Sequence, residues 1–324
     1  MISKKGLNQV KGIYFKEKFG NIIKNDPRPP INDLDSIPFP AWDLFPVDTY
    51  LKNPIGALNR NKWIDGGSNN CEIFSMNLSG TRGCPYECIY CYHDFMGQKY
   101  RKRSVKNIVE EMKLLNSKYK VKYFHFIDDE FCVDKSFVYD FCKRFREAFG
   151  DDITWGCTGR VNLMTEDLII AMKKAGCVLI GYGIESGSQK MLNAMKKGVT
   201  VEQAKKAVKL TKEYLGWADC SFMIGTPGEN RQSIEETVAF CKELELVPEV
   251  IFFTTPYPGT ELYKRAIAAG KIVDEEEYLL NLGEQGEKIM INFTEFSDNE
   301  LFKTQEWLIA ELNAWNKIKH PEGR

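Results

Sequence analysis

Three of the ten cysteines stand close together, with the spacing of a metal-ligating loop. Cys84, Cys88 and Cys91 form the pattern C-x3-C-x2-C. A closed zinc site and an iron–sulfur cluster held only by protein both take four ligands. No fourth cysteine or histidine follows at a regular spacing, so three thiolates could leave one iron of a four-iron cluster open to a small molecule. A catalytic zinc with a bound water, or a closed site completed from afar by Cys71 or His125, are the alternatives.

The composition sets limits on what this chain can be. It has 324 residues, of which 43% are hydrophobic and 27% charged, with a formal charge of −1. This is the balance of a globular protein, and a near-neutral chain has no general attraction to nucleic acid or to an acidic membrane. No apolar run approaches the ~18 residues that span a bilayer, and no long apolar segment follows Met1. We therefore expect a cytoplasmic protein that binds neither nucleic acid nor membrane, with the seven scattered cysteines reduced and mostly in the core.

Strand and helix patterns alternate around the cysteine motif. Strands are expected at residues 73–78, 121–127, 153–157, 178–183, 218–224 and 250–254. Helices are expected around 105–115, 137–149, 165–175, 200–208, 233–241 and 262–269, with capping boxes at Thr200–Gln203 and Ser233–Glu236. Six strand–helix units predict a parallel sheet covered by helices, either an open doubly wound sheet or a barrel.

Polar residues follow the predicted strands. The cysteine motif follows the first strand, residues 128–130 the second, Arg160 the third, Glu185 the fourth and residues 225–229 the fifth. In both candidate folds the chemistry collects at the carboxyl ends of the strands. We therefore expect one site where these groups converge.

These motifs resemble the radical S-adenosylmethionine (SAM) superfamily, whose signature is the C-x3-C-x2-C loop with an aromatic residue, here Tyr90, before its last cysteine. The resemblance covers about residues 72–270. It implies an α/β fold with a partial (β/α)6 TIM-type barrel, and a [4Fe–4S] cluster on Cys84, Cys88 and Cys91. It further implies that SAM chelates the open iron, and that one electron splits SAM into methionine and a 5′-deoxyadenosyl radical.

The resemblance also implies cofactor contacts. Tyr90 matches an aromatic position near the adenine. An acidic trio matches the motif that accepts hydrogen bonds from the methionine ammonium, although the family usually has glycines there, which leaves open which carboxylate acts. The trio is Asp128, Asp129 and Glu130.

Further contacts are implied on the later strands. Glu185 matches a position that bonds the ribose or the amino group, and its ionised carboxylate suits vicinal hydroxyls. Arg160 and Lys197 could each pair with the substrate carboxylate, although Lys197 taken alone is typical of a surface lysine. Met223 and Gly225 match the stretch whose backbone brackets the adenine.

A subgroup is indicated by the segments that flank the predicted barrel. Residues 34–43, the hairpin at 12–23 and residues 256–263 are similar to parts of radical SAM enzymes that carry an N-terminal cobalamin-binding domain. A doubly wound domain does not fit before Gly12, so we expect no cobalamin within this chain. Either the domain was lost, or a separate chain supplies it, or this sequence begins late. The segments are expected to be a hairpin and proline-rich connector at 1–70, the core barrel at 71–296, and a C-terminal helix and tail at 297–324. The helix should cap the barrel or cover the substrate mouth.

We therefore expect a radical SAM enzyme that abstracts hydrogen from an unidentified small-molecule substrate. Its reducing partner would be a protein such as flavodoxin or ferredoxin. One alternative is a cobalamin-dependent methyltransferase or cyclase that relies on a separate cobalamin-binding protein. A non-catalytic module that binds metal through the three cysteines is the other.

Overall fold

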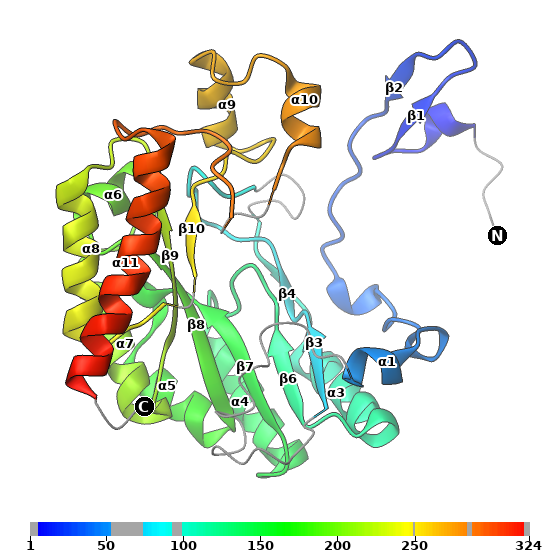
Figure 1. The fold of residues 1–324 in the computed structure, drawn as a ribbon. Coiled ribbons are helices and arrows are strands. Elements are labelled where there is room, and N and C mark those ends of the chain that lie inside the picture. The colour runs from blue at the N-terminus through cyan, green and yellow to red at the C-terminus, as the bar shows by residue number, and fades with distance from the viewer. Residues whose placement is uncertain (1–5, 53–73, 93–98, 249, 284–286, 321–324) are drawn as a thin grey trace.

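A parallel six-stranded sheet forms the centre of the molecule. The computed structural model describes residues 6–52, 74–92, 99–248, 250–283 and 287–320 (Figure 1). The strand order in the sheet is β10-β9-β8-β7-β6-β3, and every neighbouring pair is parallel. The strands are β3 (Ser75–Leu78), β6 (Tyr123–Phe126), β7 (Thr154–Gly159), β8 (Cys177–Glu185), β9 (Asp219–Ile224) and β10 (Ile251–Phe253). The expected partial (β/α)6 barrel is confirmed.

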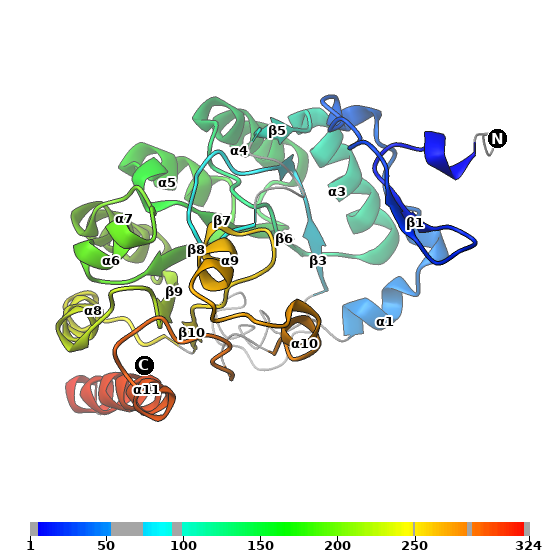
Figure 2. The ribbon, with the colours of Figure 1, turned by 90° about the horizontal axis from the view of Figure 1, so that it is seen from above.

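Helices cover the outer face of this curved sheet, as Figure 2 shows from above. They are α3 (Val105–Tyr119), α4 (Lys135–Phe149), α5 (Glu166–Lys174), α6 (Gln189–Ala194), α7 (Val201–Leu215) and α8 (Arg231–Leu244). Their apolar faces and the strands bury one large core, in which the rings of Phe141 and Trp155 pack edge to face with centroids 5.0 Å apart. This core makes the strand ends a rigid support for a site.

Two helix starts show how local sequence sets the boundaries. The capping box at Thr200 and Gln203 is confirmed at the start of α7. The capping box predicted at Ser233 and Glu236 is wrong, because α8 begins one turn earlier at the N-cap Asn230. Ser233 is the third residue of that helix and completes the box with Asn230, since its hydroxyl accepts from the Asn230 N–H. Asparagine and serine are about equally good caps, so the sequence alone did not decide between them.

The helices after β10 lie in two different places. α9 (Glu261–Ala268) lies over the strands, whereas α11 (Asp298–Lys319) lies at the periphery beside α8 (Figure 2). With α10 (Glu275–Leu280), α9 buries a small separate core around Tyr263 and Tyr278. The predicted C-terminal helix is confirmed, but its expected place over the barrel end or the substrate mouth is wrong. It packs beside α8 in the outer layer, where the Gln305 amide donates to the Ile251 carbonyl at 2.5 Å.

The N-terminal segment runs along the β3 side of the sheet (Figure 1). Its strands β1 (Tyr14–Lys16) and β2 (Ile22–Lys24) pair antiparallel and form the predicted hairpin. Its helical elements are the 3-10 helices Leu7–Gln9, Leu34–Ser36 and Trp42–Leu44, and α1 (Val47–Lys52). A short ribbon of β4 (Thr81–Arg82) and β5 (Arg101–Lys102) follows β3, and one further 3-10 helix covers Val161–Leu163. The division of the chain at residue 70 lies outside the described residues, and the division at 296 stays a prediction.

None of the helices in the described ranges is both long enough and apolar enough to cross a bilayer.

Candidate active site

A cavity of about 430 Å³ lies at the carboxyl ends of the strands. Ten of the twelve predicted site residues line it, which brings together groups from four strand ends and from the segment after α6. These ten are Cys84, Cys88, Tyr90, Cys91, Asp128, Asp129, Glu130, Arg160, Glu185 and Lys197. Four of the five strand-end groups that were predicted to converge therefore line one cavity, whereas residues 225–229 do not.

Two predicted site residues, Met223 and Gly225, are not in the lining. Met223 is buried within β9, and the Gly225 N–H donates to the carboxylate of Glu229, which bends back to the strand end. Their contact with adenine stays a prediction. Glu229 is itself buried and has an oxygen, Oε1, without a hydrogen-bond partner in the described structure.

Backbone hydrogen bonds hold the cysteine loop, residues 83–92, between two other segments. The Ile89 N–H donates to the Met195 carbonyl at 3.0 Å, and the Leu262 N–H of α9 donates to the Ile89 carbonyl at 2.9 Å. The ring of Tyr92 fills the space beside Gly259, where any Cβ would overlap it. The loop thus depends on long-range partners from α6 and α9.

Positive charge lies close to the thiols. The Arg160 Nη1 is 3.9 Å from the Cys88 sulfur, and its guanidinium stacks on the Tyr86 ring with the centroid at 3.7 Å. Donation from the Cys91 thiol, followed by the charges of Lys197 and Arg160, outweighs burial and lowers the pKa of Cys88 to about 5. Thiolates are the form of cysteine that binds metal, and this surrounding favours one.

Arg160 has unused hydrogen-bonding capacity inside the protein. It is 7% exposed, and its Nε and Nη2 have no hydrogen-bond partner among the described residues. A buried cation with unpaired donors costs free energy unless an anionic group completes it. The residues therefore fit an anionic cluster and a carboxylate-bearing ligand.

A preformed site for a single metal ion is not seen in the part of the chain that the structure describes. His125 is hydrogen bonded through Nδ1 to the Tyr123 hydroxyl at 3.0 Å and does not line the cavity. Cys71, the other distant ligand considered, lies outside the described residues.

The acidic trio, residues 128–130, is tied to the chain before the cysteine loop. The Asp128 carboxylate accepts from the Gly80 and Thr81 N–H groups, and Asp129 Oδ2 accepts from the Gly83 N–H at 3.0 Å. Glu130 Oε1 accepts from the Cys132 N–H at 3.2 Å. Burial raises the pKa of Asp128 to about 6 and that of Glu130 to about 7. The two aspartates thus fix the entry to the cysteine loop.

Tyr90, Glu185 and Lys197 form a hydrogen-bonded triad, in which the two charged residues are buried. The Lys197 ammonium donates to Glu185 Oε1 at 2.8 Å and to the Tyr90 hydroxyl at 3.0 Å, and that hydroxyl donates to the same Glu185 oxygen at 3.1 Å. Lys197 is only 7% exposed, so the surface-lysine interpretation is wrong. Burial alone would lower its pKa, but the Glu185 carboxylate and the Cys88 sulfur raise it above the ordinary value.

Backbone strain accompanies the triad. Glu185 has a φ of +69°, the left-handed region that only a few per cent of non-glycine residues adopt. The strand pairing shifts register between Gly183 and Glu185, and a Cβ on Gly183 would overlap Glu185 Oε1. Strain of this kind collects at functional sites.

Five lining residues were not predicted. They are Tyr86, Tyr92, Thr158, Gly159 and Gly183. Each lies within two residues of a predicted one along the chain, so extending each strand-end motif by two positions would have included them.

Comparisons with known proteins give independent evidence on the family of this chain. The family model described as the radical SAM superfamily matches residues 78–241. The uncharacterized methyltransferase PH0819 of Pyrococcus horikoshii is 35% identical over 265 residues, which cover 81% of this chain and 53% of that protein. The anaerobic magnesium-protoporphyrin IX monomethyl ester cyclase of Rubrivivax gelatinosus is 26% identical over 310 residues, which cover 91% of this chain and 52% of the cyclase. The chain thus spans about half the length of these curated relatives.

A solved structure shares the fold. The cobalamin-dependent SAM radical enzyme OxsB, with aqua-cobalamin and SAM bound, superposes with a TM-score of 0.60 at 17% identity, covering 99% of this chain and 43% of that one. At this identity the likeness shows the fold alone.

Proposed function

Because this chain belongs to the radical SAM superfamily, we propose that its cavity holds a [4Fe–4S] cluster on Cys84, Cys88 and Cys91 and binds SAM beside it. The observation that supports this most is that the three thiols share one cavity with two buried cations, one of which has unpaired donors. When bound and reduced, the cluster supplies the electron that splits the sulfonium of SAM into methionine and a 5′-deoxyadenosyl radical.

The other lining residues bind and orient SAM in this proposal. Arg160 pairs its free donors with the carboxylate, and the acidic trio accepts from the ammonium group. Glu185, held by Lys197 and Tyr90, presents its second oxygen to a hydroxyl or amino group. The Arg160 and Lys197 charges also offset the negative charge of the thiolates, which desolvation would otherwise oppose.

The radical then abstracts hydrogen from a small-molecule substrate. A reducing partner such as flavodoxin or ferredoxin fits the need for one electron at a low potential, and the cytoplasm fits free thiols.

A second candidate function is radical methyl transfer or ring closure with cobalamin supplied by another domain or chain. It is favoured by the methyltransferase and cyclase names of the relatives and by the cobalamin bound in OxsB. The chain spans about half of those relatives, so the remaining half of such a protein could carry that cofactor.

Anaerobic reconstitution tests the first proposal. Protein supplied with iron and sulfide should bind about four irons per chain and release 5′-deoxyadenosine when reduced with SAM present. Cys88→Ala should lose both properties, whereas Cys241→Ala, which removes a buried thiol of α8, should keep both. A protein that holds one zinc instead, with no SAM cleavage, would contradict the proposal.

Adding cobalamin separates hydrogen abstraction from the methyl-transfer form of the second candidate. Methyl-labelled SAM should give labelled substrate only under the second candidate, and only when a cobalamin-binding protein is present.

A further inference from the structure

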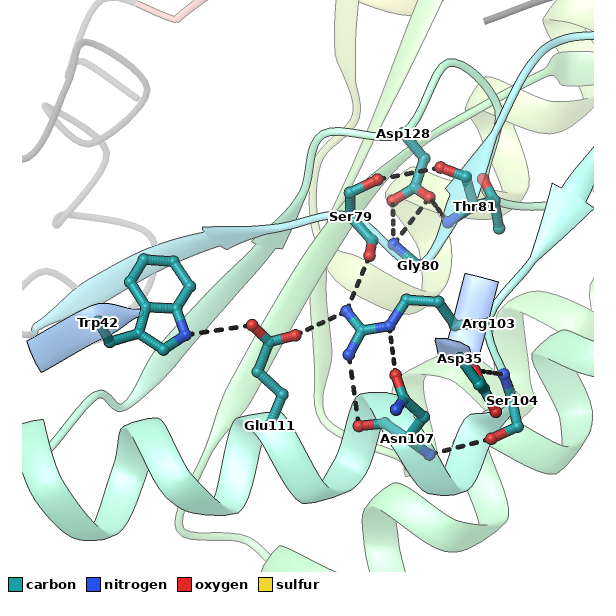
Figure 3. A network of polar contacts seen from close by, with 10 residues as sticks. All are labelled: Asp35, Trp42, Ser79, Gly80, Thr81, Arg103, Ser104, Asn107, Glu111 and Asp128. Carbon is teal, nitrogen blue, oxygen red and sulfur yellow. Dashed lines mark hydrogen bonds and ion pairs between the residues drawn. The ribbon is translucent and has the colours of Figure 1, made fainter. Parts of the chain in front are cut away.

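A chain of polar contacts links the N-terminal connector to the entry of the cysteine loop (Figure 3). The Trp42 indole N–H donates to Glu111 Oε1 at 3.2 Å. The other oxygen of Glu111 lies 2.6 Å from the Nη1 of Arg103. Glu111 is 1% exposed, so this ion pair is shielded from solvent.

Arg103 holds the carbonyl side of the turn at residues 79–81. Its Nη1 donates to the Ser79 carbonyl at 3.1 Å, and its backbone N–H donates to the Gly80 carbonyl at 2.9 Å. Its Nε donates to Asn107 Oδ1 at 2.6 Å, which fixes the plane of the guanidinium. A planar fork of donors suits this geometry better than a single ammonium does.

Asp128 holds the amide side of the same turn. Its carboxylate accepts from the Gly80 and Thr81 N–H groups, and it lines the candidate active site. The turn is therefore fixed between Arg103 and a cavity residue, and Cys84 follows three residues later. Movement of this turn would displace both the acidic trio and the first cysteine.

Packing between the connector and this turn is incomplete. A cavity of about 280 Å³ separates the connector from β3 and from the turn, and its walls include Phe39, Trp42, Ser79, Arg103 and Glu111. Where side chains leave such a space, the directional contacts across it set the relative position.

We propose that Arg103 is a positioning residue, oriented by Glu111 and Trp42, which sets the affinity for SAM by fixing the acidic trio and the entry of the cysteine loop. This inference rests on the proposed function. It assigns the connector a role in cofactor binding, although none of the connector residues that the structure describes lines the active-site cavity.

The test compares Arg103→Lys with Arg101→Lys. Arg101 is a matched control, since it lies two residues before Arg103, on β5, and its Nη1 bonds the N-terminal segment at the Ile31 carbonyl. In the reconstituted enzyme, Arg103→Lys should weaken SAM binding and raise the KM for SAM about tenfold, with kcat at saturating SAM within threefold, because the loss falls on binding. Arg101→Lys should change the affinity for SAM, the KM for SAM and kcat by less than twofold.

Hydrogen exchange gives a readout that does not depend on activity. In cluster-free protein, Arg103→Lys should speed amide exchange of Gly80 and Thr81 at least tenfold, whereas Arg101→Lys should not. If Arg103→Lys does not fold, Glu111→Gln takes its place, and it should raise the KM for SAM about threefold.

The outcomes separate the two claims. Wild-type protein that does not bind SAM overturns the proposed function and the affinity claim with it. SAM binding by wild type that is equally strong in Arg103→Lys, or a fall in thermal stability with unchanged exchange at residues 80–81, overturns the positioning role alone.

Discussion

Two buried ion pairs of this molecule are similar in chemistry and differ in their surroundings. Arg103–Glu111 lies between the connector and α3, with side chains 13% and 2% exposed. Lys197–Glu185 lines the active-site cavity, with both side chains 9% exposed. Burial therefore does not distinguish them.

The remaining contacts of each pair do distinguish them. Arg103 bonds Ser79 and Asn107 besides its ion pair, and no left-handed residue takes part. Glu185 has a left-handed backbone, and it stands in one cavity with Arg160, whose Nε and Nη2 have no partner in the described residues. A pair whose cation is hydrogen bonded to neighbouring protein groups and whose backbone is unstrained holds architecture, whereas a strained site whose cation has unpaired donors is arranged for a ligand.

Removing the cation of the cavity pair should have the largest effect. Lys197→Met leaves the Glu185 carboxylate buried without its partner, so we expect SAM cleavage to fall roughly 100-fold, about 2.7 kcal/mol of transition-state stabilisation. Deoxyadenosine release by the reconstituted enzyme measures this. Lys190→Met, which changes an exposed lysine of α6, is the control, and equal rates in the two variants would contradict the comparison.

The next largest effect is expected at Glu229, a buried carboxylate with no cationic partner among the described residues. Within that part of the chain it accepts only from the backbone N–H groups of Gly225 and Thr226, and burial raises its pKa to about 7. Because the folded pKa lies above the unfolded value near 4.5, the stability that the protonated Glu229 side chain contributes is fully present below pH 4.5. That contribution is lost as the pH rises through 7. Glu229→Gln should therefore raise the free energy of unfolding by about 2 kcal/mol at pH 8 and hardly at all at pH 4.5. Denaturant unfolding at both pH values checks this, and an equal change at both would show that the effect is not ionisation.

A smaller effect is expected from substituting Gly183, which lies against the Lys197–Glu185 pair. A Cβ at Gly183 would overlap Glu185 Oε1 and come within 3.2 Å of Lys197 Nζ, so Gly183→Ala must displace the carboxylate. We expect deoxyadenosine formation to fall about tenfold. Gly181→Ala on the same strand makes only ordinary contacts, with Asp219 Oδ2 at 3.5 Å, and should keep most of the activity. Similar losses in both would point to strand disruption instead.

The smallest effect is expected on the connector side. Trp42→Phe keeps the ring but removes the N–H that bonds Glu111, so the free energy of unfolding should fall by about 1 kcal/mol. Chemical denaturation measures this. The control is Trp307→Phe of α11, which should change the free energy of unfolding by less than about 0.5 kcal/mol. Deoxyadenosine formation at saturating SAM should stay within twofold, and a loss as large as that of Lys197→Met would remove the distinction between the two pairs.

Much of the fold could be predicted because its signals are local. Alternating apolar runs and helical periodicity indicated all six strands of the sheet and the helices between them except the short α6, and Thr200 with Gln203 marked a helix start. The start of α8 was wrong because Asn230 and Ser233 are both good caps three residues apart.

The candidate site was predictable as a set of strand ends but not as a network. The sequence placed Lys197 equally well on the surface, because its burial depends on Glu185 and Tyr90, which are 12 and 107 residues away. The acidic trio was expected at the methionine ammonium, with the acting carboxylate left open, and the structure shows the Asp128 carboxylate bonded to the turn at Gly80 and Thr81.

By itself, the sequence determined the parallel α/β architecture, the three-cysteine loop and the family, since these depend on residue types at short spacings. Only the tertiary structure decided that α9 lies over the strands while α11 takes the outer place, and that Trp42, Glu111 and Arg103 connect the N-terminal segment to the active-site entry. The physical reason is that contacts between residues 69 positions apart, such as Trp42 and Glu111, leave no periodic trace in the chain. They follow from how packed elements meet.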